Sequence, residues 1–192
     1  MLSKIDPEGR YGEPLARLLA ILQLTLRGTP FLYQGDEIGM RNGSFASIDE
    51  IQDVESLGLY AELVKTMPAG KALKRVLAGT RDHARISLPW DEIDRQRGRE
   101  DSLWNFYKNI ITLRRSSQAL VYGELAFLHP GDRTLLAYTR RLAGEHFYVE
   151  ANLGTGRRRS RALPGAELLA SNYSGQSAVL RSYEVRVYCT KS

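Results

Sequence analysis

The sequence has few of the residues that build disulfides, metal clusters or membrane spans. Cys189 is its only cysteine, so neither an internal disulfide nor a zinc–cysteine cluster can form. No apolar run approaches the roughly eighteen residues that a transmembrane helix requires. The N-terminal segment MLSKIDPEGR lacks the apolar stretch of a signal peptide. We therefore expect a soluble, cytoplasmic protein with no membrane partner.

Histidines are also scarce, and the three that occur do not cluster. His83, His129 and His146 lie far apart in the sequence, and no carboxylates at ligand spacing accompany them. Solvated side chains explain them better than metal ligands do. We expect no metal and no other cofactor.

Charge gives little support for nucleic-acid binding. The net charge is only +5 for 192 residues, and part of it lies in one arginine-rich stretch. No aromatic residues interleave with these arginines, and no nucleic-acid-binding motif accompanies them. We interpret the stretch as a solvated loop, and the alternative is a nucleic-acid-binding arm formed by Arg157, Arg158, Arg159 and Arg161.

The chain is long enough to bury a core, in one large domain or two small ones. The pattern around Arg27–Met40 organises the rest. An apolar helical period runs from Pro14 to Leu26, and Gly28 suits a helix C-terminus. The apolar run Pro30–Tyr33 then predicts a strand buried on both faces, because it shows no alternation. Helix, turn, buried strand and acidic loop are typical of a parallel α/β fold.

Three stretches resemble the α-amylase superfamily, glycoside hydrolase family 13. GTPFLYQGDEIGM is similar to the segment around the family's eighth barrel strand, and NGSFASIDEIQDVESLGLY to the following loop and helix in oligo-1,6-glucosidases and dextran glucosidases. TRDHARISLPWD is similar to the RDNARTPMQWD motif of the same group, with His83 in place of the usual Asn. The resemblance implies the C-terminal portion of such an enzyme.

Helical patterns continue to about Tyr122. Ser47 or Asp49 could cap a helix that runs towards Val64, and a short helix is expected over Lys71–Leu77. Thr80–Trp90 has no clean period and is expected to be a loop. Ser102 should cap an amphipathic helix whose solvent-facing side carries Lys108, Arg114 and Arg115.

After Gly123 the period changes to alternation, which predicts short strands joined by turns. The expected strands are Leu125–Leu128, Thr134–Arg140, His146–Leu153, Ala162–Leu169, Ala178–Leu180 and Tyr183–Tyr188. The fold class expected is α+β: residues 1–122 form the end of a (β/α)8 barrel with its last helices and eighth strand. Residues 123–192 form a small antiparallel β-sandwich, as the resemblance implies.

The catalytic residues of the family are not found in this sequence. Retaining glycosidases use two carboxyl groups, a nucleophile and a general acid/base. In the α-amylase family they follow the fourth and fifth barrel strands, and an Asp preceded by His follows the seventh. All three motifs lie upstream of the segment with which this chain begins, and no His-Asp pair occurs in it. We therefore expect the isolated chain to be inactive.

Arg81 is the residue that the resemblance assigns to substrate. It matches the arginine that helps to hold the non-reducing-end glucose in exo-acting members, and a guanidinium can donate to hydroxyls and a carboxylate together. Without the resemblance, a local ion pair with Asp82 would be the favoured interpretation of Arg81. The resemblance implies supporting roles around the site for Asp36, Glu37, Asp82 and Arg85. The alternative for Asp36 and Glu37 is simple solvation of a loop.

Two classes of function follow. The chain is either the C-terminal fragment of an exo-acting α-glucosidase or a non-catalytic carbohydrate-binding or interaction module built from the same parts. The first class implies a truncated or split gene, with an α-glucosidic oligosaccharide as substrate and an upstream-encoded N-terminal barrel fragment as partner. Hydrolases, isomerases and transglycosylases share these motifs, so the sugar linkage is left open.

Overall fold

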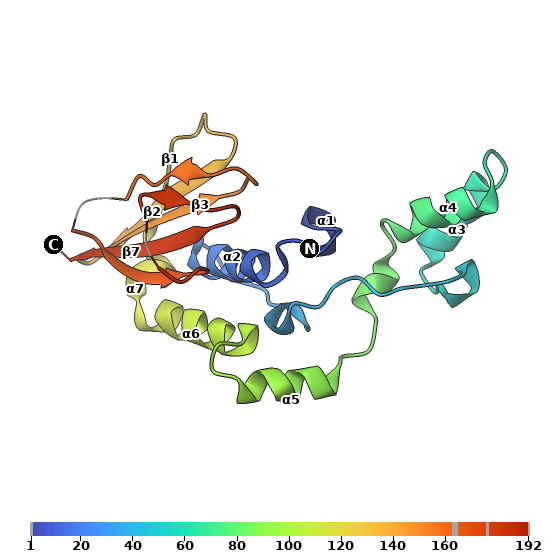
Figure 1. Cartoon of the computed structure of the whole chain (residues 1–192), viewed down its shortest axis with the longest axis horizontal. Helices are drawn as coiled ribbons and strands as arrows, with labels where there is room; N and C mark the ends of the chain where they lie inside the picture. The colour runs from blue at the N-terminus through green and yellow to red at the C-terminus, as the bar shows by residue number, and fades with distance from the viewer. Residues whose placement is uncertain (1, 163–164, 176, 192) are drawn as a thin grey trace. The chain divides into compact units, whose positions relative to one another are not determined.

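The computed structural model describes residues 2–162, 165–175 and 177–191. These residues form two compact units. One consists of residues 40–89, and the other joins residues 2–39 to residues 90–191. Figure 1 labels the α-helices of both units and the strands β1, β2, β3 and β7.

The larger unit combines helices with an antiparallel sheet. Its helices are α1 (Leu2–Ile5), α2 (Gly12–Thr25), the 3-10 helix η1 (Asp36–Ile38), α5 (Trp90–Gly98), α6 (Leu103–Ser116) and α7 (Gln118–Tyr122). The strands of its five-stranded sheet, in spatial order, are β1 (Glu124–Leu128), β2 (Leu135–Leu142), β3 (Glu145–Asn152), β7 (Val185–Lys191) and β5 (Glu167–Ser171). A separate two-stranded ribbon pairs β4 (Arg158–Arg159) with β6 (Val179–Leu180).

Helix α2 confirms the first predicted helix and forms the centre of the core. Leu15, Leu18, Ile21 and Leu24 recur at helical spacing and are almost completely buried. The helix ends at Thr25, and Gly28 follows with φ of 116°, a left-handed conformation that glycine adopts without a steric penalty. The leucine stripe is therefore the buried face that the sequence predicted.

Helix α6 packs on α2 and confirms the predicted capped helix. The Ser102 hydroxyl accepts a hydrogen bond from the Asn105 N–H at 3.2 Å, as an N-cap residue should. Tyr107 and Ile110 turn inward and join the core of α2. The expected solvent-facing side is wrong for Arg114, which is only 7% exposed. Its guanidinium points inward because it binds the carbonyl oxygens beyond the end of α2.

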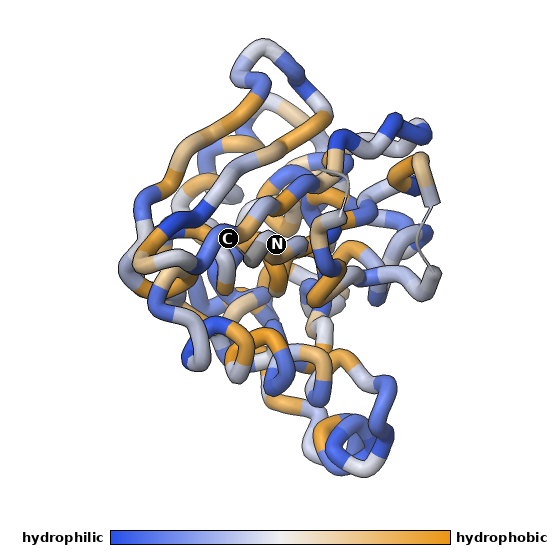
Figure 2. The backbone as a smooth tube through the Cα atoms, turned by 90° about the vertical axis from the view of Figure 1, so that its left-hand side faces the viewer, coloured by the Kyte–Doolittle hydropathy of each residue, from blue (hydrophilic) through white to orange (hydrophobic). Residues whose placement is uncertain are grey.

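One face of the sheet packs on the helices. Tyr138 of β2, Phe147 and Val149 of β3 and Val187 of β7 lie in the same buried cluster as the leucines of α2. Helices α2, α6 and α7 lie together on this side of the sheet (Figure 1). Hydrophobic and hydrophilic stretches alternate along the backbone in short steps, as Figure 2 shows. The central strands β2 and β3 are buried on both faces, because the opposite face of the sheet is covered as well.

The other face of the sheet carries a small apolar cluster, Ala137, Tyr148 and Tyr188, and polar contacts with the β4–β6 ribbon and its neighbouring residues. Glu150 of β3 accepts a hydrogen bond from the Arg161 N–H at 2.8 Å. Arg186 of β7 pairs with Glu184 at 2.7 Å and donates to the carbonyl oxygen of Val179 at 3.0 Å. Five of the six predicted strands are present at about their predicted positions. The sixth, Ala162–Leu169, includes residues 163–164, which lie outside the described residues, and the strand there is β5, Glu167–Ser171. The second sheet in the described residues has only two strands. The predicted sandwich is therefore not confirmed.

The strand predicted at Pro30–Tyr33 is wrong. These residues belong to no sheet in the described part of the chain, and Phe31 is 82% exposed. Leu32 and Tyr33 are 45% and 54% exposed. A strand exists only as part of a ladder, and no described strand lies alongside this segment. The segment has the apolar composition of a buried strand, but no described strand pairs with it.

Two other elements differ from the sequence analysis. Helix α5 begins at Trp90, in a charged stretch for which no helix was expected, and Gln96 fixes it by donating to the carbonyl oxygen of Ile38 at 3.2 Å. Ion pairs at (i, i+3) spacing, such as Arg95–Glu92, lie on its exposed side. The ribbon strand β4 falls inside the arginine-rich stretch, which was expected to be a loop. Arg158 there pairs with Asp132.

The smaller unit contains η2 (Ile48–Glu50), α3 (Val54–Leu63), α4 (Ala69–Leu77) and η3 (Arg81–Ala84). Ser47 caps η2 in a capping box with Glu50, so this predicted cap is confirmed. The single helix expected from there to Val64 is instead split before Val54. The N–H groups of Gln52 and Asp53 donate to the Asp82 carboxylate, so they are not available to a continuous helix. Helix α4 confirms the predicted helix over Lys71–Leu77, and η3 interrupts the predicted loop.

Arg114 generates a stability prediction. It donates to the carbonyl oxygens of Leu24 at 2.6 Å, Leu26 at 3.1 Å and Gly28 at 2.6 Å. We expect Arg114→Met to lower the free energy of unfolding by about 1.5–3 kcal/mol, because a hydrogen bond to a charged group contributes that much. The carbonyl oxygens that Arg114 binds would also lose their donor. Urea unfolding measures the loss. Arg115→Met is the control, because Arg115 is exposed on the same helix. Equal stability of the two variants would contradict the assignment.

Candidate functional site

The candidate site lies in the smaller unit, around Arg81 at the start of η3. The Thr80 hydroxyl caps η3 by accepting from the Asp82 N–H at 3.3 Å. Arg81 then reaches back to the start of α3. Its Nε donates to Asp53 Oδ1 at 3.0 Å, and its Nη2 lies 2.9 Å from the same oxygen. Nη2 also lies 3.0 Å from Glu55 Oε2. Two carboxylates therefore fix one edge of the guanidinium.

Asp53 is the rigid member of this pair, because its carboxylate is 5% exposed and its second oxygen is also bound. The Ser56 hydroxyl donates to Oδ2 at 2.7 Å. This hydrogen bond, followed by the hydrogen bonds and charge of Arg81, lowers the pKa of Asp53 from 3.8 to about 2, against the opposing effect of burial. The hydrogen bond and the charge of Asp53 in turn raise the pKa of Arg81. Asp53 is therefore ionised at neutral pH and serves as a fixed anion.

Asp82 ties η3 to the segment before α3. Its Oδ2 accepts from the N–H groups of Gln52 at 2.7 Å and Asp53 at 2.9 Å, and its Oδ1 pairs with Arg85 at 3.0 Å. The hydrogen bond from the Asp53 backbone is the largest of the effects that lower the pKa of Asp82. The sequence alternative of an Arg81–Asp82 ion pair is not what the structure contains. Arg81 pairs with Asp53 and Glu55, and Arg85 with Asp82.

Sequence reasoning missed Asp53 and Glu55. They precede Arg81 by 28 and 26 residues, a separation for which no local periodicity gives a signal. Both lie inside IQDVESLGLY, a stretch that indicates the family resemblance but not which residues pair with Arg81. Only the approach of η3 to the start of α3 brings the two acids to the arginine.

His83 has a packing role in this unit. Its Nε2 lies 2.7 Å from the carbonyl oxygen of Leu77, which can only accept, so Nε2 carries the proton. Its ring lies 5.3 Å from that of Phe45. The histidine thus links η3 to α4 and to the segment before η2. It stands where the family motif has Asn.

Asp36 and Glu37 lie in the larger unit, and each closes a local turn. Asp36 Oδ2 accepts from the Tyr33 N–H at 3.1 Å, and Glu37 Oε2 accepts from the Gly35 N–H at 2.9 Å. Gly35 and Gly39 flank η1 with φ of 92° and 71°. Both acids therefore hold the shape of the loop after the predicted eighth strand.

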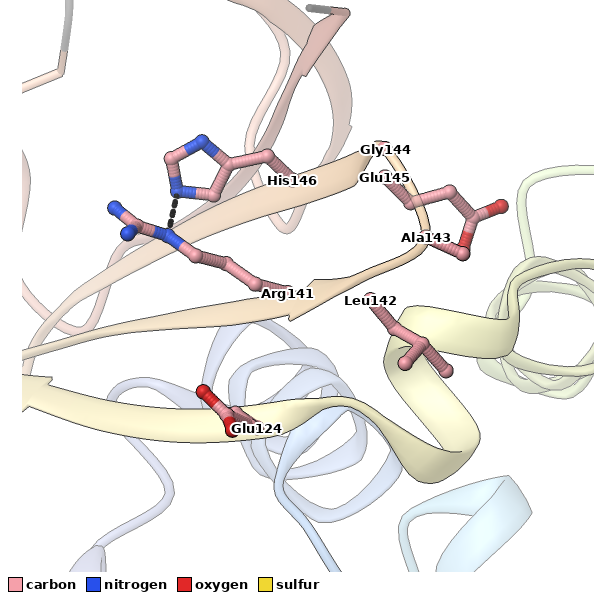
Figure 3. Close-up of a pocket in the computed structure, with 7 residues that line it drawn as sticks. All are labelled: Glu124, Arg141, Leu142, Ala143, Gly144, Glu145 and His146. Atoms are coloured by element: carbon pink, nitrogen blue, oxygen red, sulfur yellow. Dashed lines mark hydrogen bonds between the residues drawn. The ribbon is translucent and has the colours of Figure 1, made fainter.

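A second polar hollow lies at the β2–β3 hairpin of the larger unit (Figure 3). Arg141 Nε donates to His146 Nε2 at 2.7 Å, so His146 is neutral and carries its proton on Nδ1. That nitrogen lies 3.0 Å from the Thr190 hydroxyl. Burial, then the Arg141 charge, lowers the pKa of His146. The arrangement is a hydrogen-bonded row across three strands.

Chemically, the exposed edge of the Arg81 cluster can hold a polar ligand. Its two buried carboxylates, Asp53 and Asp82, have lowered pKa values and are ion-paired. Arg81 is 61% exposed in its side chain, and its Nη1 has no partner in the described residues. Within residues 2–162, 165–175 and 177–191, no group of His, Cys, Asp or Glu side chains could hold a metal ion. The described helices include none that is long and apolar enough to cross a membrane.

Comparison with protein families gives a match over most of the chain. Residues 1–123 match the family described as "Alpha amylase, catalytic domain". The curated relatives include the oligo-1,6-glucosidase of Bacillus cereus, 30% identical over 229 residues that cover 100% of this chain and 40% of that protein. They also include the probable oligo-1,6-glucosidase 2 of Bacillus subtilis (strain 168), 28% identical over 98% of this chain and 40% of that protein. The chain thus spans about 40% of the length of these relatives.

Solved structures support the same assignment. The trehalose-6-phosphate hydrolase of Bacillus licheniformis superposes with a TM-score of 0.87 at 25% identity, covering 100% of this chain and 41% of that one. Isomaltulose synthase from Klebsiella sp. gives a TM-score of 0.81 at 31% identity, covering 93% of this chain and 38% of that one. The match over residues 1–123, carried by a fold that these enzymes share, shows that the chain belongs to the α-amylase family, glycoside hydrolase family 13.

Proposed function

We propose that the chain is the C-terminal part of an exo-acting α-glucosidase of the oligo-1,6-glucosidase type. Such an enzyme hydrolyses α-glucosidic bonds in oligosaccharides with retention, through two carboxyl groups. The observation that carries the proposal is the family match over residues 1–123, together with oligo-1,6-glucosidase relatives along the whole chain. The proposed division is a barrel portion over residues 1–122 and a C-terminal sheet domain over residues 123–192.

Arg81 is the proposed contact with substrate. Asp53 and Glu55 bind one edge of its guanidinium, while Nη1 has no partner among the described residues. A fork that is held on one edge can donate to sugar hydroxyls from the other without losing much side-chain entropy on binding. The exposed position of Arg81 and its rigid anchor, Asp53, both favour this role over that of a simple surface ion pair.

The other predicted residues have proposed supporting roles. Asp82 and Arg85 hold η3 against the start of α3, which sets the position of Arg81. Asp36 and Glu37 hold the turn after Tyr33. None of the four is proposed to touch the reacting bond.

An upstream barrel segment is the proposed partner. It would supply the nucleophile and the general acid/base, which this sequence lacks. It would also supply strands alongside Pro30–Tyr33, whose apolar side chains are exposed in the chain alone. This part of the proposal accounts for an apolar segment that the described residues do not cover.

The isolated chain should hydrolyse neither an aryl α-glucoside nor isomaltose, because it has no nucleophile and no general acid/base. Addition or co-expression of an upstream barrel segment from an oligo-1,6-glucosidase should restore turnover. The assay is release of aryl alcohol and of glucose, before and after addition. Turnover by the rigorously purified chain would overturn the placement of the catalytic residues. Binding of isomaltose with no restored turnover would favour a non-catalytic carbohydrate-binding module.

Arg81→Lys should lower kcat/KM of the restored enzyme by about tenfold or more, because lysine keeps the charge but loses the planar fork. Arg85→Lys is the matched control, since it makes the same chemical change in a residue that only pairs with Asp82. Steady-state kinetics and melting temperature are measured for both variants. Full efficiency of Arg81→Lys, or an effect confined to its melting temperature, would show that Arg81 is a structural residue.

Asp53 should contribute a pH-dependent part of the stability. Its pKa is lowered to about 2 in the folded chain from 3.8, so its contribution is present above pH 3.8 and is lost as pH falls through about 2. Asp53→Asn should therefore be less stable than the native chain at pH 6, and the difference should shrink between about pH 4 and pH 2. Denaturant unfolding at several pH values measures it, with Asp49→Asn as a control at an exposed carboxylate. A difference that does not change with pH would contradict the ion-pair role.

A further inference from the structure

A groove of about 430 Å³ lies at the C-terminal end of α2, in the larger unit. We call it the α2 groove. No acidic side chain lines it. Its lining consists of two arginines, one aromatic residue and small or apolar residues: Arg27, Gly28, Thr29, Pro30, Arg114, Val121 and Tyr122. Of these residues, the function proposed above uses only Pro30, as the start of the segment that a barrel strand would cover.

Two buried positive charges lie at this end of α2 without carboxylate partners. Arg114 is 7% exposed and donates only to the carbonyl oxygens of residues 24, 26 and 28. Arg140 of β2 is 0% exposed and donates to the carbonyl oxygens of Thr25 at 2.7 Å and Gly123 at 3.1 Å. Its Nε is buried and has no hydrogen-bond partner in the described residues. Neutral carbonyls solvate both guanidinium groups, and no carboxylate of the described residues pairs with either of them.

A third positive charge stands at the mouth of the groove. Arg27 is exposed and forms no ion pair or hydrogen bond within the described residues. The C-terminus of α2 offsets only about half an elementary charge. The summed positive charge of the three arginines therefore exceeds the negative charge at the helix C-terminus by more than two elementary charges. Burial lowers the pKa of both Arg114 and Arg140, and repulsion from Arg114 and Arg27 lowers that of Arg140 further.

We infer that the α2 groove binds an oxyanion, a phosphoryl group or a carboxylate, between Arg27 and Arg114. Arg27 can swing over the groove and donate two parallel hydrogen bonds, the geometry that guanidinium groups form with phosphate and carboxylate. Arg114 is held in place by its carbonyl partners and supplies a fixed charge at the lining. Tyr122, which is 73% exposed, lies at the same groove and can pack on the rest of the ligand.

The inference does not depend on the proposed glucosidase function, because it rests only on charges in the larger unit. It also goes beyond a capping role for the arginines. Capping the end of α2 explains why Arg114 and Arg140 point at its carbonyl oxygens. Capping does not explain the excess of positive charge at this end of α2. It also does not explain why Arg27, two residues beyond the end of the helix, has no anionic partner in the described residues.

The test is a titration of the purified 192-residue chain with inorganic phosphate at constant ionic strength. Calorimetry should show saturable binding, and the melting temperature should rise with phosphate concentration, since a ligand of the folded state stabilises it. Arg27→Gln should weaken binding by at least about tenfold, the scale of one charge-assisted hydrogen bond. Arg115→Gln, the same charge change at an exposed position of α6 outside the groove, should weaken it less than about twofold.

Two further ligands, glucose 6-phosphate and acetate, show whether the groove prefers a phosphoryl group or a carboxylate. A phosphoryl site should bind phosphate and glucose 6-phosphate more tightly than acetate, and more weakly as pH falls and the dianion is protonated. A carboxylate site, such as one for an acidic side chain of another polypeptide segment, should bind acetate at least as tightly as phosphate and without that pH dependence. Either result supports an oxyanion site. Absence of saturable binding by all three anions, or equal losses in Arg27→Gln and Arg115→Gln, would overturn it.

Discussion

The larger unit depends on how the carbonyl end of α2 is bound. The last turn of a helix leaves carbonyl oxygens without intrahelical donors, and these oxygens must find partners when they are buried. Here Arg114 comes from α6 and Arg140 from β2, and both converge on residues 24–28. The Tyr138 hydroxyl adds a contact with that of Thr25 at 2.6 Å. The helical layer and the sheet are thus joined by polar contacts as well as by the leucine core.

The smaller unit uses the same kind of long-range polar contact on a smaller scale. Asp82 accepts from two backbone N–H groups before α3, and Arg81 reaches the carboxylates at its start. These contacts join segments about thirty residues apart, where helices α3 and α4 bury few apolar side chains. Positioning of the candidate sugar contact and stability of the unit therefore share the same residues. A variant that removes Asp53 changes both.

Local patterns in the sequence were sufficient for most helices and strands. The stripe of α2, the Ser102 cap and the alternation after Gly123 each predicted an element that the structure contains. The predictions were wrong where contacts with a distant segment of the chain decide the local structure. Pro30–Tyr33 has the composition of a strand but no described strand with which to pair. Arg114 lies on the helix face that was predicted to be solvent-exposed, but its guanidinium binds buried carbonyl oxygens. The partners of Arg81 could not be predicted either, because nothing local links it to Asp53. Whether Arg81 contacts sugar stays a prediction.

The contact between Arg140 and the Thr25 carbonyl also affects the order in which the chain can fold. The two residues are separated by 115 positions, so on the ribosome the end of α2 emerges well before its donor. At roughly 5–20 residues per second, Arg140 follows about 6–23 s later. During that interval the carbonyl oxygen of Thr25 lacks this donor, whereas Arg114, which binds the carbonyl oxygens of residues 24, 26 and 28, emerges earlier. The helix layer can therefore reach its final form only after β2 has been synthesised, which couples the two halves of this unit during biosynthesis.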